Sequence, residues 1–421
     1  MSAKSSTKSI AILADKSALN MYTLATIRHL CSIFGVAEAG ADEADVLWVS
    51  ISDPDDIKVL WDARKIANGR PVIMGGFEAW FGVPYLAWAD AVVVGEGVEF
   101  IRTWGEQGMD AALDLPCVLT MDRYKRGIEV LPSYDVGYLD MPIVKVGGKV
   151  RYYFLAGRGC KGKCSFCATS WVQPHSKCPD RKIRRVVKEV EDRKGKLTLI
   201  SNDSDSVIQS SVVNAQSVRV VDYLREPLRY KSSMLHFGIE FWDEGSRAKA
   251  GKPISNEDIY RLFQTTAEVR QQMELFFIVG YPGWSMNSVE KFAENALPLG
   301  TDNSPFVHVK CTYLDPCPHT PLAEQPVNPE WCNIPEVFAE MNSRNKRIRV
   351  FPTRSAGRSA WRTALHRCTP EEALELPPEP KDTNVEESFR NFRAELDGRG
   401  LGFLLDGSRK LNEAAIKTRI K

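Results

Sequence analysis

Residues 157–171 have the sequence GRGCKGKCSFCATSW, and this stretch decides which fold the rest of the chain is expected to adopt. It holds Cys160, Cys164 and Cys167 in a C-x3-C-x2-C arrangement within a glycine-rich segment. Thiolates are soft ligands that suit iron–sulfur clusters. Three cysteines can bind three irons of a 4Fe-4S cluster and leave the fourth iron open to a cofactor or substrate. We therefore interpret the segment as a cluster-binding loop.

A structural zinc site is the alternative that this loop leaves open. Zinc in structural sites has four protein ligands, and His175 or Cys178 could add a fourth to the three cysteines. A zinc loop predicts no particular motifs elsewhere in the chain. The decision between the two metals therefore depends on residues outside the loop.

The whole chain has the composition of an ordinary soluble protein. Its 421 residues are 43% hydrophobic and 26% charged, with a net charge of +1, and this length predicts two or three domains. There is no run of about 18 apolar residues that would predict a membrane span, and no signal peptide is expected. We expect a cytoplasmic protein whose ten cysteines are too sparse for a disulfide scaffold.

Residues 1–125 alternate short apolar runs with helical patterns. The predicted strands are Ile10–Ala14, Val46–Ser50, Pro71–Met74 and Ala91–Val94, and helices are predicted around Leu19–Phe34 and Asp55–Asn68. Strands that alternate with helices indicate βαβ units and a parallel sheet. We predict an α/β protein that begins with a Rossmann/flavodoxin-like domain, followed by a connector over residues 126–149.

Residues 150–325 repeat this alternation and predict a second α/β domain. Its strands are expected at Val150–Leu155, Leu197–Ser201, Leu235–Glu240, Glu274–Val279 and Val307–Leu314. Residues 326–421 lose this rhythm, and we interpret them as a basic C-terminal extension.

The cysteine loop resembles the signature of the radical S-adenosylmethionine (SAM) superfamily, in which an aromatic residue, here Phe166, precedes the third cysteine. The resemblance implies a partial (β/α)6 barrel whose first strand, here Val150–Leu155, leads into the cluster loop. It also implies that SAM chelates the open iron and that Phe166 lies near the SAM adenine.

Four segments farther along the chain resemble other motifs of that superfamily, in the expected order. They are the polar segment at Asp203, the Gly-Ile-Glu strand end of Gly238 and Glu240, the Ile-x-Gly-x-Pro-Gly strand end of Gly280 and Pro282, and the segment Tyr313–Leu322. The resemblance implies that SAM is bound by residues of the first three segments, namely Asp203, Gly238, Glu240, Gly280 and Pro282. Residues 199–205 depart from the common glycine-glycine-glutamate form, and His319 stands where glycine is usual. The ordered set favours a cluster over zinc.

Residues 75–100, GGFEAWFGVPYLAWADAVVVGEGVEF, resemble the end of the cobalamin-binding domain that precedes many radical SAM barrels. Many such domains bind cobalt through the histidine of an Asp-x-His-x-x-Gly loop. The only histidine before His175 is His29, which lacks that aspartate and glycine and lies in a predicted helix. Either cobalamin binds without a histidine ligand, or the domain is a scaffold without a corrin. We favour the scaffold.

The C-terminal extension contains a basic run, residues 344–367, that has no acidic residue. Arg354, Arg358 and Arg362 are spaced four residues apart, so a helix would align them. Such a patch suits phosphate contacts, and Trp361 could stack on a base. We predict that the three arginines bind substrate, with DNA or a nucleotide as the partner. A solvated basic surface is the alternative.

The resemblance implies an enzyme that cleaves SAM reductively. An electron donor such as flavodoxin would reduce the cluster, and the resulting 5′-deoxyadenosyl radical would abstract hydrogen from the substrate. Our specific hypothesis is a radical isomerase that rearranges an amino-acid-modified thymidine in phage DNA, in the host cytoplasm. The alternatives are a cobalamin-dependent radical SAM methyltransferase and a zinc-bound nucleic-acid-binding protein.

Overall fold

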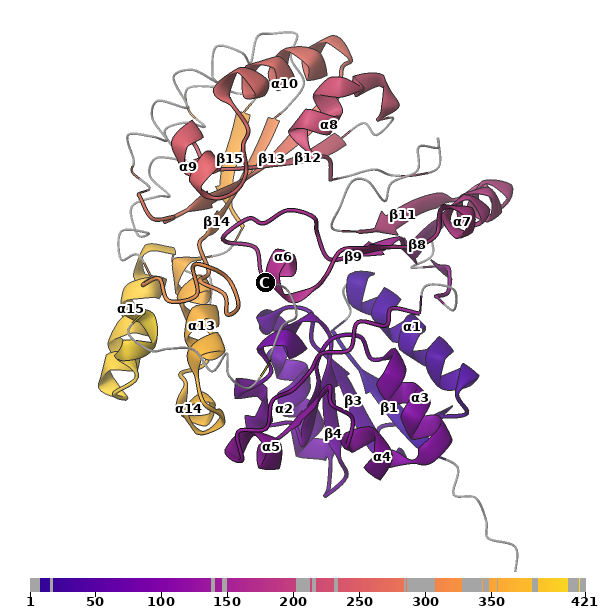
Figure 1. The fold of residues 1–421 in the computed structure, drawn as a ribbon. Coiled ribbons are helices and arrows are strands. Elements are labelled where there is room, and N and C mark those ends of the chain that lie inside the picture. The colour runs from indigo at the N-terminus through magenta and orange to yellow at the C-terminus, as the bar shows by residue number, and fades with distance from the viewer. Residues whose placement is uncertain are drawn as a thin grey trace, which may run out of the picture.

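The structure is a computed structural model, and it describes residues 8–15, 18–137, 141–145, 150–201, 213, 217–230, 234–283, 285, 307–327, 343, 348–353, 355–380, 385–407 and 416. Within them the chain forms a front domain, a barrel domain and a group of C-terminal helices (Figure 1). None of the helices in this part of the chain is long and apolar enough to cross a membrane.

The front domain is a six-stranded sheet in the order β2-β1-β3-β4-β5-β6. Its strands are β1 (Ser9–Leu13), β2 (Ala37–Glu38), β3 (Val46–Ser50), β4 (Val72–Gly75), β5 (Ala91–Val93) and β6 (Val118–Thr120). Its helices are α1 (Ala18–Ile33), α2 (Ile57–Ile66), α3 (Val98–Gln107), α4 (Met109–Leu113) and α5 (Met121–Lys125), with the 3-10 turns η1 (Pro54–Asp56), η2 (Phe77–Phe81) and η3 (Pro84–Ala87). The pairs are parallel except β5 with β6. This order confirms the predicted flavodoxin-like domain.

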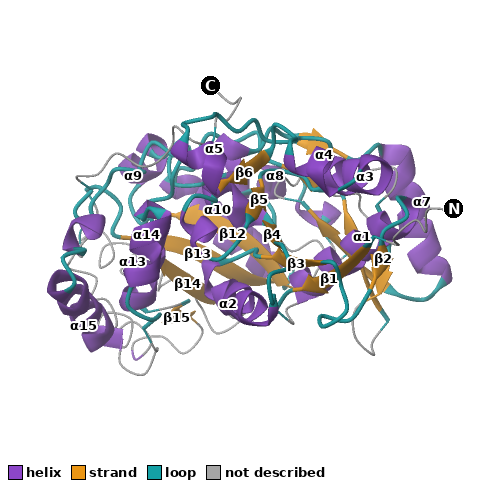
Figure 2. Ribbon diagram, turned by 90° about the horizontal axis from the view of Figure 1, so that it is seen from below, coloured by secondary structure: helices purple, strands orange, loops and turns teal. Residues whose placement is uncertain are grey.

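Strand β3 shows why this sheet is covered on both faces. Its five residues, VLWVS, are all buried. Trp48 belongs to the core that includes α1 and α3, whereas Leu47 and Val49 belong to the core that includes α2. Successive side chains of a strand point to opposite faces, so a continuous apolar run suits a sheet between two helix layers. Figure 2 shows β1, β3 and β4 side by side in the middle of this sheet.

The barrel domain is an open sheet in two segments, ordered β7-β8-β11 and β12-β13-β14-β15. Its strands are β7 (Val144–Lys145), β8 (Arg151–Leu155), β11 (Lys196–Ile200), β12 (Met234–Glu240), β13 (Gln272–Val279), β14 (Val307–Tyr313) and β15 (Ile348–Pro352). The pairs are parallel except β7 with β8. Isolated parallel bridges, Leu197 with Val213 and Ser217 with His236, lie between the two segments. All five predicted strands are present.

The helices of the barrel domain alternate with its strands. They are α6 (Thr169–Val172), α7 (Asp180–Asp192), α8 (Val220–Arg225), α9 (Glu244–Lys249) and α10 (Asn256–Glu268), with the 3-10 turn η5 (Pro227–Arg229). A short ribbon, β9 (Gly157–Arg158) with β10 (Ser176–Lys177), precedes α7. The predicted partial barrel requires helices that alternate with the strands of a parallel sheet, and this domain has that arrangement.

The sheet continues beyond residue 325, where we had placed the end of the barrel domain. Strand β15 pairs in parallel with β14. Arg349 is exposed and Val350 is buried, which is the alternation of a half-covered strand. The surrounding arginines concealed this short alternation in the sequence.

The C-terminal helices join the two domains. They are α13 (Ala356–Arg367), α14 (Pro370–Glu375) and α15 (Val385–Gly398), followed by the 3-10 turn η8 (Gly402–Leu405). Helix α13 packs against α15 and η8, and α14 packs against η3 of the front domain. In Figure 1 these helices lie beside the front domain and below β14 and β15.

Candidate functional site

The cluster loop, residues 159–175, begins directly after β9, the short strand that follows β8, and its two ends are held together at a neck. The neck is the β9–β10 ribbon, which brings the two ends of the loop together. Gly159 has a φ of +62°, and a β-carbon added there would collide with the carbonyls of Gln173 and Pro174. Only glycine fits this left-handed position against two backbone groups. The loop therefore leaves the barrel domain after β8 and returns to nearly the same place, with its two ends held together.

The three cysteines gather within this loop. A β-carbon added at Gly162 would lie 3.4 Å from Cys160 Sγ and 3.6 Å from Cys164 Sγ. Burial raises the pKa of the Cys164 thiol to about 11, although nearby Lys252 opposes that rise, and the charges of Cys160 and Cys167 also act on it. The raised pKa favours the neutral thiol in the metal-free protein, and it is the proximity of the three cysteines on one loop that suits a metal cluster.

The same thiols do not form a zinc site in this structure. Among the described residues, no three His, Cys, Asp or Glu side chains are arranged around a single ion position. Thiolates bound to zinc must all approach one ion to about 2.3 Å. In a 4Fe-4S cluster each cysteine binds a different iron, so the thiols need no common point. Cys178, proposed as a fourth zinc ligand, is buried outside the loop.

Strand β12 ends in a bulge that turns Glu240 toward the cluster loop. The register of β12 against β13 shifts between Gly238 and Glu240, and Glu240 has a φ of +71°. A β-carbon at Gly238 would collide with the ion pair between Glu240 and Lys252. Burial alone would lower the pKa of Lys252, but Glu240 and the thiols of Cys164 and Cys167 raise it. A left-handed non-glycine residue is typical of functional sites.

Aromatic side chains continue the site from the loop to β13. The rings of Phe166 and Phe241 are 5.6 Å apart edge to face, and those of Phe241 and Tyr281 are 4.3 Å apart. The hydroxyls of Ser165 and Tyr281 are 3.2 Å apart. Gly280, buried and with a φ of +83°, turns the chain immediately before Tyr281. These contacts connect the end of β13 to the cysteine loop.

The structure thus brings most of the predicted SAM-binding residues to one place. Phe166, Gly238, Glu240 and Gly280 lie around the loop of Cys160, Cys164 and Cys167. Pro282 is exposed just beyond Gly280, and Asp203 lies outside the described residues. We had not assigned roles to Lys252 or Tyr281. Their positions in the sequence could have indicated a role at the site, since Lys252 follows the glutamate motif and Tyr281 stands between the predicted Gly280 and Pro282.

The predicted substrate-binding arginines face the front domain. Arg354 lies outside the described residues. Helix α13 aligns the other two as predicted, and both pair with carboxylates: Arg358 with Asp55 at 2.7 Å and Glu379 at 2.5 Å, and Arg362 with Asp53, Asp55 and Asp315. The side chain of Arg362 is only 12% exposed. Their contact with DNA or a nucleotide stays a prediction.

Trp361 does not fit the predicted stacking on a base. Its side chain is buried, and its indole nitrogen donates to the carbonyl of Pro377 at 3.1 Å. The prediction for this residue is wrong because Trp361 lies on the inner side of α13, against the protein.

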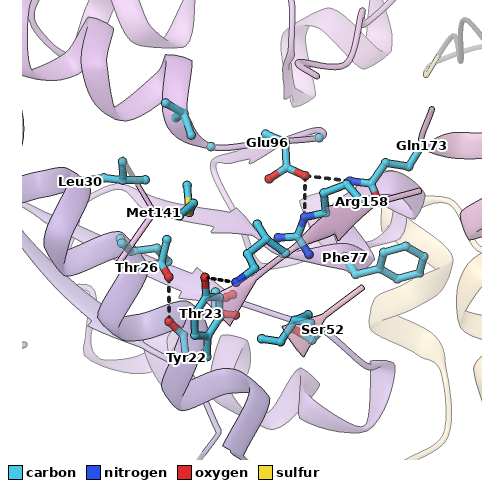
Figure 3. Close-up of a pocket in the computed structure, with 18 of the residues that line it drawn as sticks. Tyr22, Thr23, Thr26, Leu30, Ser52, Phe77, Glu96, Met141, Arg158 and Gln173 are labelled. Atoms are coloured by element: carbon cyan, nitrogen blue, oxygen red, sulfur yellow. Dashed lines mark hydrogen bonds and ion pairs between the residues drawn. The ribbon is translucent and has the colours of Figure 1, made fainter. Parts of the chain in front are cut away.

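A cavity of about 350 Å³ lies between the front domain and the neck of the cluster loop. The front domain contributes residues at the carboxyl ends of its parallel strands, including Ser50, Gly76 and Glu96. The barrel domain contributes Arg158 and Gln173 from the two sides of the neck. Figure 3 shows both side chains directed at Glu96. The carboxyl ends of parallel strands are where open α/β sheets bind ligands, and the volume is that of a small-molecule site.

Trp48 and Ser50, two residues that line the cavity, carry buried polar atoms without a hydrogen-bond partner in the described structure. In the described part of the chain, Trp48 Nε1 and Ser50 Oγ form no hydrogen bond. The indole of Trp48 also fills the space beside two glycines of the segment 75–100, since β-carbons at Gly75 and Gly97 would lie 2.6 Å and 3.4 Å from it. Buried polar groups are rarely left unpaired in native proteins. A ligand with hydrogen-bonding groups would fit this cavity.

No histidine is among the described residues that line the cavity. His29 is exposed on α1 and lines a different cleft with α7. The prediction that His29 is an ordinary helix residue is therefore confirmed. A corrin in the cavity would have to bind without a protein histidine on cobalt.

No protein-family model matches the sequence, and no curated protein matches it. Two solved structures of the radical SAM methyltransferase TsrM from Kitasatospora setae do match the fold. The one with tryptophan substrate and the SAM analogue aza-SAM has a TM-score of 0.58, 11% identity, and coverage of 77% of this chain and 76% of TsrM. The one with cobalamin and a 4Fe-4S cluster has a TM-score of 0.56, 10% identity, and coverage of 78% and 75%.

At such low identity the similarity concerns the fold. The chain has the fold of a B12-type radical SAM enzyme, in which a cobalamin-binding-like front domain precedes a radical SAM barrel. This confirms the predicted fold class and both resemblances on which it was based.

Proposed function

We propose that this chain is a cobalamin-dependent radical SAM methyltransferase. The observation that carries the proposal is the shared cavity, whose walls come from the strand ends of the front domain and from the neck of the cluster loop. An occupant there would touch both domains. Its unpartnered Trp48 Nε1 and Ser50 Oγ suit the amides, hydroxyls and phosphate of cobalamin. This choice reverses our preference for an empty scaffold domain.

Different residues of the chain would bind the cluster and SAM. Cys160, Cys164 and Cys167 would hold three irons of the cluster. Glu240 and Lys252 place a carboxylate and an ammonium group beside these cysteines, which suits the amino and carboxylate groups of SAM. When bound, the cluster supplies an electron to SAM and the corrin carries a methyl group.

The methyltransferase is better supported than the isomerase of our specific hypothesis. TsrM, the similar fold, is a methyltransferase and is solved with cobalamin. Arg358 and Arg362, the residues that suggested a DNA substrate, are directed at carboxylates of the protein. The zinc-bound alternative lacks a convergent ligand set among the described residues.

Anaerobic reconstitution with iron and sulfide tests the proposal. We expect a brown protein that binds added hydroxocobalamin and transfers a labelled methyl group from SAM to added reduced cobalamin. Cys164→Ala should abolish cluster binding. Cys178→Ala is the matched control, because this nearby buried thiol should matter only to a zinc site.

Three other results would contradict the proposal in different ways. Zinc binding that depends on Cys178 would support the nucleic-acid-binding alternative. SAM cleavage to 5′-deoxyadenosine, with neither corrin binding nor methyl transfer, would support the isomerase. A protein that binds neither a cluster nor a corrin would exclude both radical enzymes.

A further inference from the structure

Glu96 connects the front domain to both ends of the cluster loop. It lies just after β5, where its backbone N–H donates to the carbonyl of Ser133 at 2.9 Å. Its oxygen Oε1 accepts a hydrogen bond from Gln173 Nε2 at 2.7 Å and lies 3.0 Å from Arg158 Nε (Figure 3). The side chain of Glu96 is 13% exposed. One carboxylate oxygen therefore holds two side chains of the barrel domain.

These two partners stand on opposite sides of the loop's neck. Arg158 directly precedes Gly159 and Cys160, whereas Gln173 follows α6 and ends the part of the loop that holds the cysteines. The ribbon of β9 and β10 already brings the two sides together through the backbone. Glu96 adds a charge-assisted tie between them, supplied by the other domain.

A second contact from the same cavity supports this connection. The hydroxyl of Tyr22, on α1, accepts a hydrogen bond at 3.0 Å from the backbone N–H of Leu155. Leu155 is the last residue of β8 and precedes β9, the first strand of the loop's neck. Both Tyr22 and Glu96 line the cavity. Its front-domain wall thus touches the end of β8 and the neck of the loop.

The second oxygen of Glu96 is available to a ligand. Within the described part of the chain, Oε2 forms no hydrogen bond or ion pair, although the side chain is largely buried and lines the cavity. Oε2 is not among the buried polar atoms that lack a partner in the described structure, so it is open to the cavity and can accept a hydrogen bond from the cavity's occupant. The natural donor is an N–H group on the occupant of the cavity, and carboxamides on the rim of a corrin have such groups.

We propose that Glu96 is a positioning residue that couples the two cofactor sites. It orders the neck of the cluster loop through Oε1 and accepts a carboxamide N–H of the cavity's occupant through Oε2. Filling the cavity therefore fixes Glu96 and tightens the loop that holds the cluster. The identity of the occupant rests on the proposed function, whereas the ordering of the neck does not.

Hydrogen–deuterium exchange on the metal-free protein tests the first half. We expect Glu96→Ala to exchange the backbone amides of residues 157–177 roughly tenfold faster, as the loss of a charge-assisted bond implies. Glu96→Gln keeps one acceptor and should lie between Glu96→Ala and the parent protein. The matched control is Glu106→Gln, which removes the same charge at an exposed position of α3. Unchanged exchange at the neck in a folded Glu96→Ala protein would overturn the proposal.

Added hydroxocobalamin tests the coupling. In the parent protein it should slow exchange at residues 157–177, and in Glu96→Ala, at saturating hydroxocobalamin, this slowing should be lost. Equal slowing in both proteins would overturn the coupling and leave the proposed function standing. Failure of the parent protein to bind hydroxocobalamin would overturn the proposed function and the coupling, while the metal-free exchange result would still decide the role of Glu96 at the neck.

Discussion

The front domain meets the rest of the chain at two polar joints, and they are built differently. At the cavity joint, Glu96 and Tyr22 contact the cluster loop region, while Trp48 Nε1 and Ser50 Oγ have no partner among the described residues. At the arginine joint, α13 packs beside the front domain and its arginines are surrounded by carboxylates: Asp53, Asp55, Asp315 and Glu379.

The difference separates a structural contact from a site prepared for a ligand. Charged groups that leave water must be paired, and the arginine joint pairs its cations several times over. A cavity that leaves buried donors and acceptors unpaired loses stability for as long as it is empty. Mutations at the arginine joint should therefore act on stability, and those at the cavity joint on binding.

The largest effect is expected for Arg362→Ala. Burial alone would lower the pKa of Arg362, but Asp315 and the other carboxylates around it raise that pKa above its ordinary value. Removing the cation leaves the largely buried carboxylate of Asp315 without it, and breaking a buried ion pair in this way typically costs about 3–5 kcal/mol. We expect a clear drop in the melting temperature, measured by calorimetry.

Two controls calibrate that result. Arg358→Ala removes a side chain that is 26% exposed and should cost less. Arg126→Ala breaks an exposed pair with Asp122 and should change stability by about 1 kcal/mol or less. If Arg362→Ala melts like the parent protein but loses binding to DNA, the arginine joint is a binding surface after all.

The cluster loop shows what the sequence could predict. Cysteine spacing, Phe166 and the later strand-end motifs depend on local sequence. The structure places Phe166, Glu240 and the turn at Gly280 beside the cysteine loop. The strand positions were also predictable, because alternation and apolar runs are local signals. Gly238 illustrates the limit, since its lack of a side chain makes room for Lys252, which is 14 residues away in the sequence.

The arginine joint shows what the sequence could not predict. The four-residue spacing of Arg358 and Arg362 correctly predicted a shared helix face. It could not reveal that this face meets Asp53 and Asp55, about 300 positions earlier in the chain. Partners so distant are set by tertiary packing, so a basic run alone does not distinguish a surface for phosphate from an internal ion-pair network.

Gly75→Ala should have an intermediate effect, at the cavity joint. An added β-carbon would lie 2.6 Å from the indole of Trp48, which must shift to relieve the contact. Overpacking of this kind costs about 1–3 kcal/mol. Because Trp48 lines the cavity, we expect weaker hydroxocobalamin binding, measured by absorbance titration.

The control for this change is Gly40→Ala, in the same domain. A β-carbon at Gly40 meets no atom within 4 Å, so both stability and binding should remain as in the parent protein. Normal hydroxocobalamin affinity in Gly75→Ala would mean that the occupant does not contact the Trp48 side of the cavity.

The smallest effect on stability, and the sharpest test of the comparison, is expected for Ser50→Ala. Ser50 is fully buried and its hydroxyl has no partner in the described structure, so its removal should leave the melting temperature unchanged or slightly higher. If the hydroxyl contacts the occupant, hydroxocobalamin affinity should fall by roughly fivefold, the value of one hydrogen bond. Ser359→Ala is the matched control. Ser359 is also buried, its hydroxyl has no hydrogen-bond partner among the described residues, and it lies on α13, outside the cavity lining. The two variants should therefore agree in stability and differ in binding. If both variants bind hydroxocobalamin equally well, the hydroxyl of Ser50 is not part of a ligand site. It would then be an unpaired buried group like that of Ser359, and Ser50 would no longer distinguish the cavity joint from the arginine joint.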